Sequence, residues 1–158
     1  MTKLMALAVA LLVAAPAFAQ TNINLGGIRA DSSAPVEVAA DSLSVDQDSG
    51  TAVFTGNVVI GQGDLRLSAS SVRVVYSDET GDIAQLIASD GVTFVTDTEA
   101  AEAQSAIYNL VTGVLTLTGD VLLTQGASAL SAEQMTVNIN TGAAQMSGRV
   151  RTVFQQGN

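Results

Sequence analysis

The sequence predicts an all-β protein of about 12–16 short antiparallel strands, arranged as four repeated units in a stack that is open at both ends. Three observations lead to this fold class. A degenerate unit of about thirty residues recurs four times. Apolar and polar side chains alternate within each unit, and no segment beyond the N-terminal leader has helical periodicity. The composition is rich in Gly, Val, Thr, Ser and Ala, which is typical of strands joined by tight turns.

Residues 1–19 have the features of a secretory signal peptide. Lys3 supplies a positive charge, Met5 to Val13 form a short apolar core, and Ala17 and Ala19 frame a small-residue cleavage site. We therefore expect cleavage after Ala19 and export across the membrane. An uncleaved membrane anchor is the alternative, but the apolar run is too short to span a bilayer.

The mature chain is expected to form one domain. Residues 20–34 are polar and aperiodic, which predicts a flexible lead-in, residues 35–154 carry the repeats, and residues 155–158 form a short tail. Loss of Lys3 leaves five arginines against fifteen carboxylates, a net charge of −10. Such a chain repels nucleic acid and anionic membrane surfaces, so an anionic ligand must be held mainly by apolar contacts.

Each unit is marked by an opening alanine and by two glycines at regular positions. Each unit opens with an alanine, at Ala40, Ala69, Ala103 and Ala132. A first turn follows at Ser49-Gly50, Thr80-Gly81, Thr112-Gly113 and Thr141-Gly142, whose glycines are 31, 32 and 29 positions apart. A second glycine stands six residues later at Gly56, Gly119 and Gly148, and ten later at Gly91, which predicts an insertion around residues 85–89. Both glycines are interpreted as hairpin turns that join strands of five to seven residues, because glycine supplies the positive φ of such turns. Residues 100–106 contain helix-forming side chains, but their place in the repeat predicts a strand.

The recurring pattern resembles a known family. The stretches Ala40–Gly50 and Thr51–Ile60 resemble the OstA-like domain, and residues 35–154 resemble the LptA family of periplasmic lipopolysaccharide-transport proteins. The resemblance implies a folded-over β-jelly-roll with a hydrophobic groove that holds the acyl chains of lipid A. It implies head-to-tail self-association between an inner-membrane-anchored partner and an outer-membrane translocon. The expected function is therefore to carry lipopolysaccharide from the inner to the outer membrane.

Inward-facing apolar side chains are the candidates for lining this groove. They are Val45, Phe54, Val58, Ile60, Leu67, Val74, Phe94, Leu115, Leu117, Val121 and Leu123. This set is mostly aliphatic and has few aromatic rings, so it leaves room for acyl chains. Each acyl methylene that is removed from water contributes about 0.8 kcal/mol to the free energy of binding. The strand arginines, Arg66, Arg73, Arg149 and Arg151, suit phosphate binding, but the alternation places them on the outer face.

We expect no enzymatic activity, no cofactor and no metal. The chain lacks Cys and His, which removes thiol nucleophiles, histidine bases and most zinc sites. Acidic clusters at residues 46–48, 78–82 and 97–102 suit either glycoside hydrolysis or calcium binding. They lie at turns, however, where aspartate commonly makes local hydrogen bonds.

Two alternatives to a lipid carrier remain. One is a structural repeat protein of the cell envelope with a filled core, and the other is an exported β-helical hydrolase with a carboxylate pair in one cleft. The first and last strands, near residues 36–45 and 148–154, have no further repeat unit beyond them to pair with, so each leaves an open sheet edge. Such unpaired edges predict end-to-end self-association.

Overall fold

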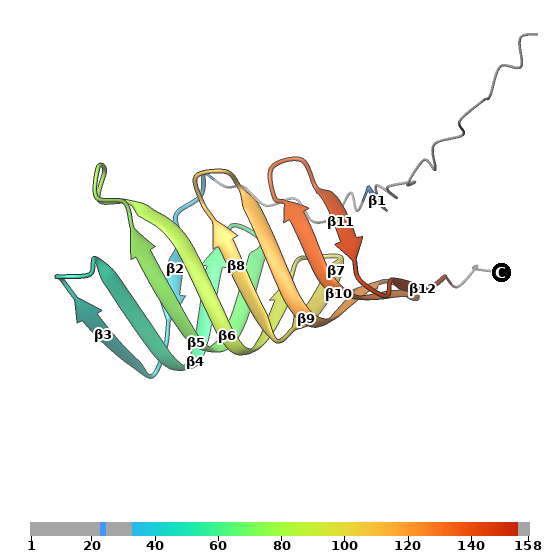
Figure 1. The fold of residues 1–158 in the computed structure, drawn as a ribbon, viewed down its shortest axis with the longest axis horizontal. Coiled ribbons are helices and arrows are strands. Elements are labelled where there is room, and N and C mark those ends of the chain that lie inside the picture. Colours follow the sequence, from blue (N-terminus) through green and yellow to red (C-terminus); the bar gives the residue numbers. More distant parts are fainter. Residues whose placement is uncertain (1–22, 25–32, 155–158) are drawn as a thin grey trace, which may run out of the picture.

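The computed structural model describes residues 23–24 and 33–154, which form one antiparallel sheet of 12 strands (Figure 1). The strands are β1 (Ile23–Asn24), β2 (Glu37–Ala39), β3 (Ser42–Asp46), β4 (Thr51–Gln62), β5 (Leu65–Tyr76), β6 (Ile83–Val95), β7 (Glu99–Ala103), β8 (Ser105–Asn109), β9 (Val114–Gln125), β10 (Ser128–Asn138), β11 (Ala143–Ser147) and β12 (Arg151–Val153). The all-β prediction is confirmed. Within the described residues there is no helix that could cross a membrane.

Several strands are much longer than predicted, because the second glycine of each unit does not form a hairpin turn. β4, β6 and β9 have 12, 13 and 12 residues, and each continues without interruption past its glycine, which is Gly56, Gly91 and Gly119 respectively. Each of these glycines has a positive φ and lies beside a second residue with positive φ. The pairing register of β4 shifts at the same place, between Thr55 and Val58. The glycines are therefore bends within strands, and the prediction of turns there is wrong. A bulge and a turn both need positive φ, so the sequence alone does not separate them.

The bends fold the sheet into two facing layers. We call first layer the segments β3, 51–55, 71–76, 83–89, β8, 114–118, 134–138, β11 and β1. We call second layer the segments β2, 58–62, 65–69, 92–95, β7, 121–125, 128–132 and β12. The strands stack along the long axis of the molecule, with β3 near one end and β12 near the other (Figure 1).

A repeated polar contact holds the line of bends. Asn57 donates a hydrogen bond from its side-chain amide to the Asp41 carboxylate (3.0 Å), and Gln104 donates one to the Asp120 carboxylate (2.9 Å). The Arg149 guanidinium lies 3.6 Å from the Glu133 carboxylate at the corresponding place in the last unit. Asp41, Gln104 and Glu133 each follow directly after a unit-opening alanine. Two of these alanines, Ala103 and Ala132, are buried. We attribute the repeated alanine to its place beside the bend, where the two layers meet.

The second unit differs from the others at its hairpin rather than in mid-strand. Residues 85–89, where the insertion was predicted, belong to the continuous strand β6 and pair with β5 and β8. The extra length instead extends the β5–β6 hairpin, where Tyr76 pairs with Ile83 beyond a register shift. A cavity of about 600 Å³ lies beside it, lined in part by Val36, Gln62, Tyr76, Ile83 and Leu110.

Two further predictions concern strand positions. Residues 100–106 are strand as predicted, except that Gln104 separates β7 from β8. In the segment predicted to be a flexible lead-in, Ile23 and Asn24 pair with Ala144 and Ala143 at the edge of β11. The predicted signal peptide, residues 25–32 and the tail lie outside the described residues.

Candidate functional site

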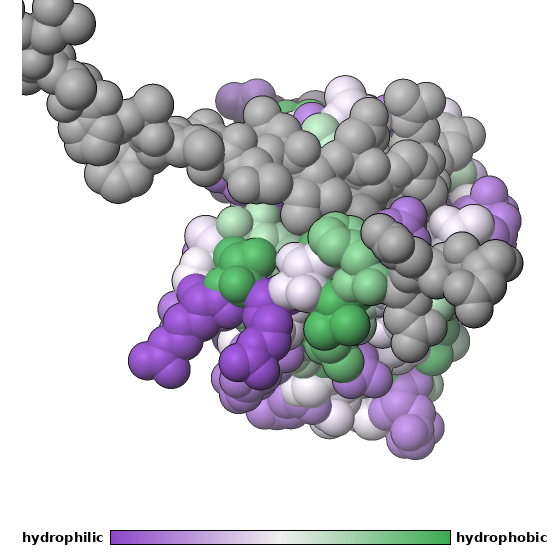
Figure 2. Space-filling model, turned by 90° about the vertical axis from the view of Figure 1, so that its right-hand side faces the viewer, coloured by the Kyte–Doolittle hydropathy of each residue, from purple (hydrophilic) through white to green (hydrophobic). Residues whose placement is uncertain are grey.

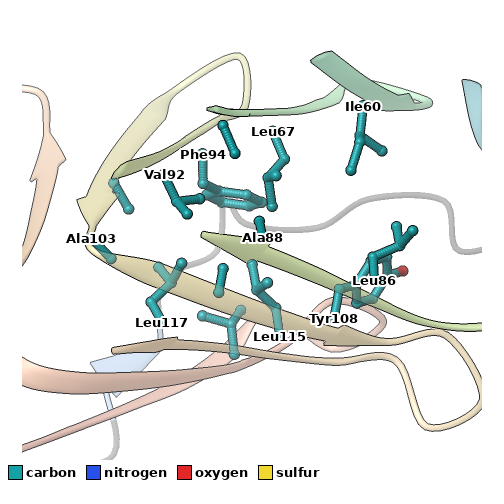
Figure 3. Packing of buried hydrophobic residues seen from close by; sticks show 14 of the residues in the cluster. Ile60, Leu67, Leu86, Ala88, Val92, Phe94, Ala103, Tyr108, Leu115 and Leu117 are labelled. Carbon is teal, nitrogen blue, oxygen red and sulfur yellow. The ribbon is translucent and has the colours of Figure 1, made fainter. Parts of the chain in front are cut away.

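The inner faces of the two layers are made of continuous cross-strand rows of apolar side chains. One row of the second layer is Ile60, Leu67, Phe94, Ala101, Leu123 and Leu130. Two rows of the first layer are Val45, Ala52, Val74, Leu86, Tyr108, Leu115, Val137 and Ala144, and Leu43, Phe54, Val72, Ala88, Ala106, Leu117, Met135 and Met146. Side chains from both layers point toward one another (Figure 3). Neighbouring strands therefore present one apolar interior along the length of the stack.

Most of the predicted groove residues lie in this interior. Nine of them are buried in a single cluster, namely Val58, Ile60, Leu67, Val74, Phe94, Leu115, Leu117, Val121 and Leu123. Phe54 is partly buried and packs against that cluster. Val45 shares a row with Ala52 but is 61% exposed. β3 is the last strand of the first layer, so Val45 belongs to the inner face without being enclosed.

One side-chain hydrogen bond crosses the interior from layer to layer. The Tyr108 hydroxyl, on the first layer, donates to Oε1 of Gln62 on the second layer at 2.9 Å. Nε2 of Gln62 also donates to the Ala34 carbonyl at 3.1 Å, which attaches the segment before β2. Burial raises the pKa of Tyr108 because the phenolate is poorly solvated there. This bond holds the layers together on the side of the molecule away from the bends.

Replacing Tyr108 by Phe is expected to lower the free energy of unfolding by about 1–2 kcal/mol, because the buried hydrogen bond between the two layers is lost. The folded protein keeps the phenol proton at pH values where the unfolded chain has lost it, since the folded pKa is the higher one. Native stability should therefore fall as pH rises above about 10, and the Tyr108→Phe variant should show a shallower fall. Urea unfolding at pH 7 to 11 measures both effects. Tyr76→Phe, at an exposed tyrosine of the same layer, is the control, and an equal change in that variant would contradict the interlayer role.

The arginines point away from the interior, as the alternation predicts. Arg66, Arg73, Arg149 and Arg151 are all exposed. The Arg66 guanidinium donates to the carbonyls of Gly63 and Leu65 at 2.8 and 2.9 Å. The interior of the described chain therefore holds no cation for a phosphate group.

In the first acidic cluster, Asp46 stabilises the turn that follows β3. Oδ1 of Asp46 accepts hydrogen bonds from the backbone N–H groups of Asp48 (2.9 Å) and Ser49 (3.3 Å). The hydrogen bonds from Ser49 are the main reason that the pKa of Asp46 is lowered. Among the described residues, no three acidic side chains are close enough to hold a metal ion.

Sequence reasoning missed a third row on the second layer. It is formed by Gln62, Leu65, Thr96, Glu99, Gln125 and Ser128, and we call it the rim row because it lies at the strand ends farthest from the bends. Each polar member stands two positions along its strand from a buried apolar residue, as Gln62 does from Ile60 and Gln125 from Leu123. A polar residue that continues an inward period just before a turn is the signal that was overlooked.

Two folded layers around an apolar interior, with no charged side chain in its core rows, define a folded-over β-jelly-roll. The chain belongs to the LptA/LptD N-terminal domain family of lipopolysaccharide transport proteins, whose model matches residues 37–143. The resemblance seen in the sequence is thereby confirmed.

The chain is also similar to individual proteins. An uncharacterised protein of Rhizobium meliloti is 32% identical over 89% of this chain and 82% of its own length. The lipopolysaccharide export system protein LptA of Haemophilus influenzae is 26% identical over 96% of this chain and 90% of its own. A crystal structure of LptH, the LptA homologous periplasmic component of the lipopolysaccharide transport device of Pseudomonas aeruginosa, superposes with a TM-score of 0.72 at 18% identity. It covers 80% of this chain and 99% of the LptH chain, and it supports the fold.

Proposed function

We propose that this protein is a periplasmic carrier that holds the acyl chains of lipopolysaccharide between its two layers and passes the lipid toward the outer membrane. The observation that carries the proposal is the continuity of the inner apolar rows from one end of the stack to the other. A lipid moving along these rows stays in contact with apolar side chains on successive strands. Each methylene kept from water contributes about 0.8 kcal/mol, so no cation is needed for affinity.

Entry of acyl chains requires the layers to separate. The core side chains of both layers are almost completely buried against one another, and Phe94 is 0% exposed. At the bends the two layers are connected by continuous backbone. On the opposite side of the described chain they are joined by the Tyr108–Gln62 hydrogen bond and by apolar contact. We infer that lipid enters from this opposite side. The packed interior also favours the second candidate function, a structural protein of the envelope with a permanently filled core.

Photo-crosslinking separates these two functions. Phe54 lies on the inner face and is partly buried, and its replacement by benzoylphenylalanine preserves an aromatic side chain. The same group at Val59, on the outer face of the same strand, is the matched control. The carrier predicts a crosslinked adduct with lipopolysaccharide in cells from residue 54 and none from residue 59. Adducts from neither position, or equal yields from both, would favour the structural protein.

The two ends of the stack carry exposed apolar side chains, from which we propose head-to-tail self-association. At the β3 end these are Leu43 and Val45, which are 55% and 61% exposed. At the β12 end they are Val150, Val153 and Phe154, and Figure 2, which looks onto that end, shows apolar surface next to strongly hydrophilic groups. The contact is heterologous and does not close, so it extends into a chain of molecules. Such chains would reach from an inner-membrane-anchored partner to an outer-membrane translocon of the same pathway.

Phe154→Asp is expected to weaken self-association about tenfold, since the buried contact of one large apolar side chain is lost. Sedimentation velocity over a range of protein concentrations measures the effect. Val111→Asp is the control, because Val111 is exposed in the turn after β8 and belongs to neither end. Identical oligomers of the Phe154→Asp variant and the unmodified protein would show that β12 does not form the contact.

A further inference from the structure

The rim row interrupts an otherwise apolar inner face. Its neighbour row on the same layer, from Ile60 to Leu130, is apolar throughout, whereas five of the six rim positions are polar. Gln62, Thr96 and Glu99 are buried in spite of their polarity. Buried polar groups are costly to a fold, so three of them at one edge of an apolar interior call for a physical reason.

Thr96 is the most informative member of the row. It follows β6, its backbone N–H donates to the Glu99 carbonyl at 2.9 Å, and it continues the inward period of Val92 and Phe94. Its side chain is only 7% exposed, yet among the described residues its hydroxyl oxygen has no hydrogen-bond partner. A valine of the same shape would remove this cost. The hydroxyl is therefore a group that the fold does not need and that a ligand can use.

The electrostatic character of the row limits what that ligand group is. The row contains no arginine or lysine, and it contains the buried carboxylate of Glu99, which accepts a hydrogen bond from Gln125 at 2.9 Å. A phosphate group would therefore find no cationic partner in this row. Hydroxyl and amide groups, by contrast, match the amides and the hydroxyl of the row.

The row also has space beside it and the right position. A cavity of about 600 Å³ lies at its Gln62 end, and its mixed lining includes Val36, Ile83 and Leu110 as well as Tyr76 and Asp82. Since we propose that acyl chains enter between the layers from this side, the atoms where the chains join a sugar would lie at the rim row.

We propose that the rim row, with Thr96 at its centre, binds the uncharged hydroxyl and amide groups at the junction between the acyl chains and the sugar of the lipid. This inference rests on the proposed function and adds to it a track of hydrogen-bonding groups along one layer. The apolar rows supply affinity, and the rim row selects an acylated amino sugar over a simple fatty acid.

Thr96→Val tests the assignment through two readouts that a merely structural residue would not combine. The variant should unfold at a higher temperature than the unmodified protein, because a buried hydroxyl without a partner is removed. It should bind lipid A about fivefold more weakly, which is the effect of one hydrogen bond between neutral groups, and should bind a fluorescent fatty acid as the unmodified protein does. Thr96→Ser, which keeps the hydroxyl, should restore lipid A binding. Thr124→Val, at an exposed outward position of β9, should change neither ligand.

The outcomes separate the rim row from the carrier function. Unchanged lipid A binding by Thr96→Val, or an equal loss for lipid A and the fatty acid, would overturn the rim-row proposal while leaving the carrier intact. A loss that disappears with dephosphorylated lipid A would show a phosphate contact and would likewise overturn it. An unmodified protein that binds neither ligand would instead refute the carrier function.

Discussion

Phe94→Ala is expected to lower the free energy of unfolding by about 3–5 kcal/mol, which is the usual cost of removing a buried aromatic ring. Phe94 is fully buried, lies in the middle strand segment of the second layer, and pairs across the sheet with Ala101. Its ring points toward the first layer (Figure 3). The small neighbour cannot fill the space that the ring leaves, so a cavity remains between the layers.

Equilibrium urea unfolding followed by circular dichroism measures this effect. Val95→Ala is the matched control, because Val95 is the next residue of the same strand and is exposed on the outer face. The control should change stability by less than about 1 kcal/mol. A similar small loss for Phe94→Ala would mean that the layers collapse onto one another easily, and hence that the interior adapts its volume as a lipid carrier must.

Gly119→Ala is expected to cost about 2–4 kcal/mol, and Gly91→Ala only about 1–2 kcal/mol, although both glycines have a φ of 86°. A Cβ at either position meets the same backbone strain. At Gly119 it would also lie 2.9 Å from Cβ of Gln104, too close to be relieved by rotating the end of that side chain, whereas at Gly91 nothing lies within 4 Å. The difference between the two variants therefore isolates the packing of the neighbouring strand over the bend.

The same unfolding experiment compares the two glycine variants. Equal losses would show that backbone strain alone governs the bends. A larger loss for Gly119→Ala would show that the Gln104 side chain, packed against the Gly119 bend, adds to the cost of a Cβ there. Gly126→Ala, in the β9–β10 hairpin with φ of 57° and open space around it, gives the cost of a left-handed alanine outside the bends.

The candidate site was only partly accessible from the sequence. The period of two correctly placed Ile60, Phe94 and Leu117 on the inner face, because successive side chains of a strand alternate whatever the strand pairs with. The same period included Val45, which the structure leaves exposed, because enclosure depends on how many strands lie beyond β3 and not on β3 itself. The rim row escaped notice for a related reason. Its members come from separate strands and become a row only through cross-strand register.

What the sequence by itself determined is local: the all-β class, the four units, the inward and outward faces of each strand, and the outward position of the arginines. These follow from side-chain alternation and glycine spacing, which act over a few residues. What only the tertiary structure decided is non-local: that Gly56, Gly91 and Gly119 bend strands rather than end them, and that the two layers bury one another's apolar rows. The physical reason is that a positive φ allows a bend or a turn equally well. Pairing with neighbouring strands and contact between the layers then select the bend.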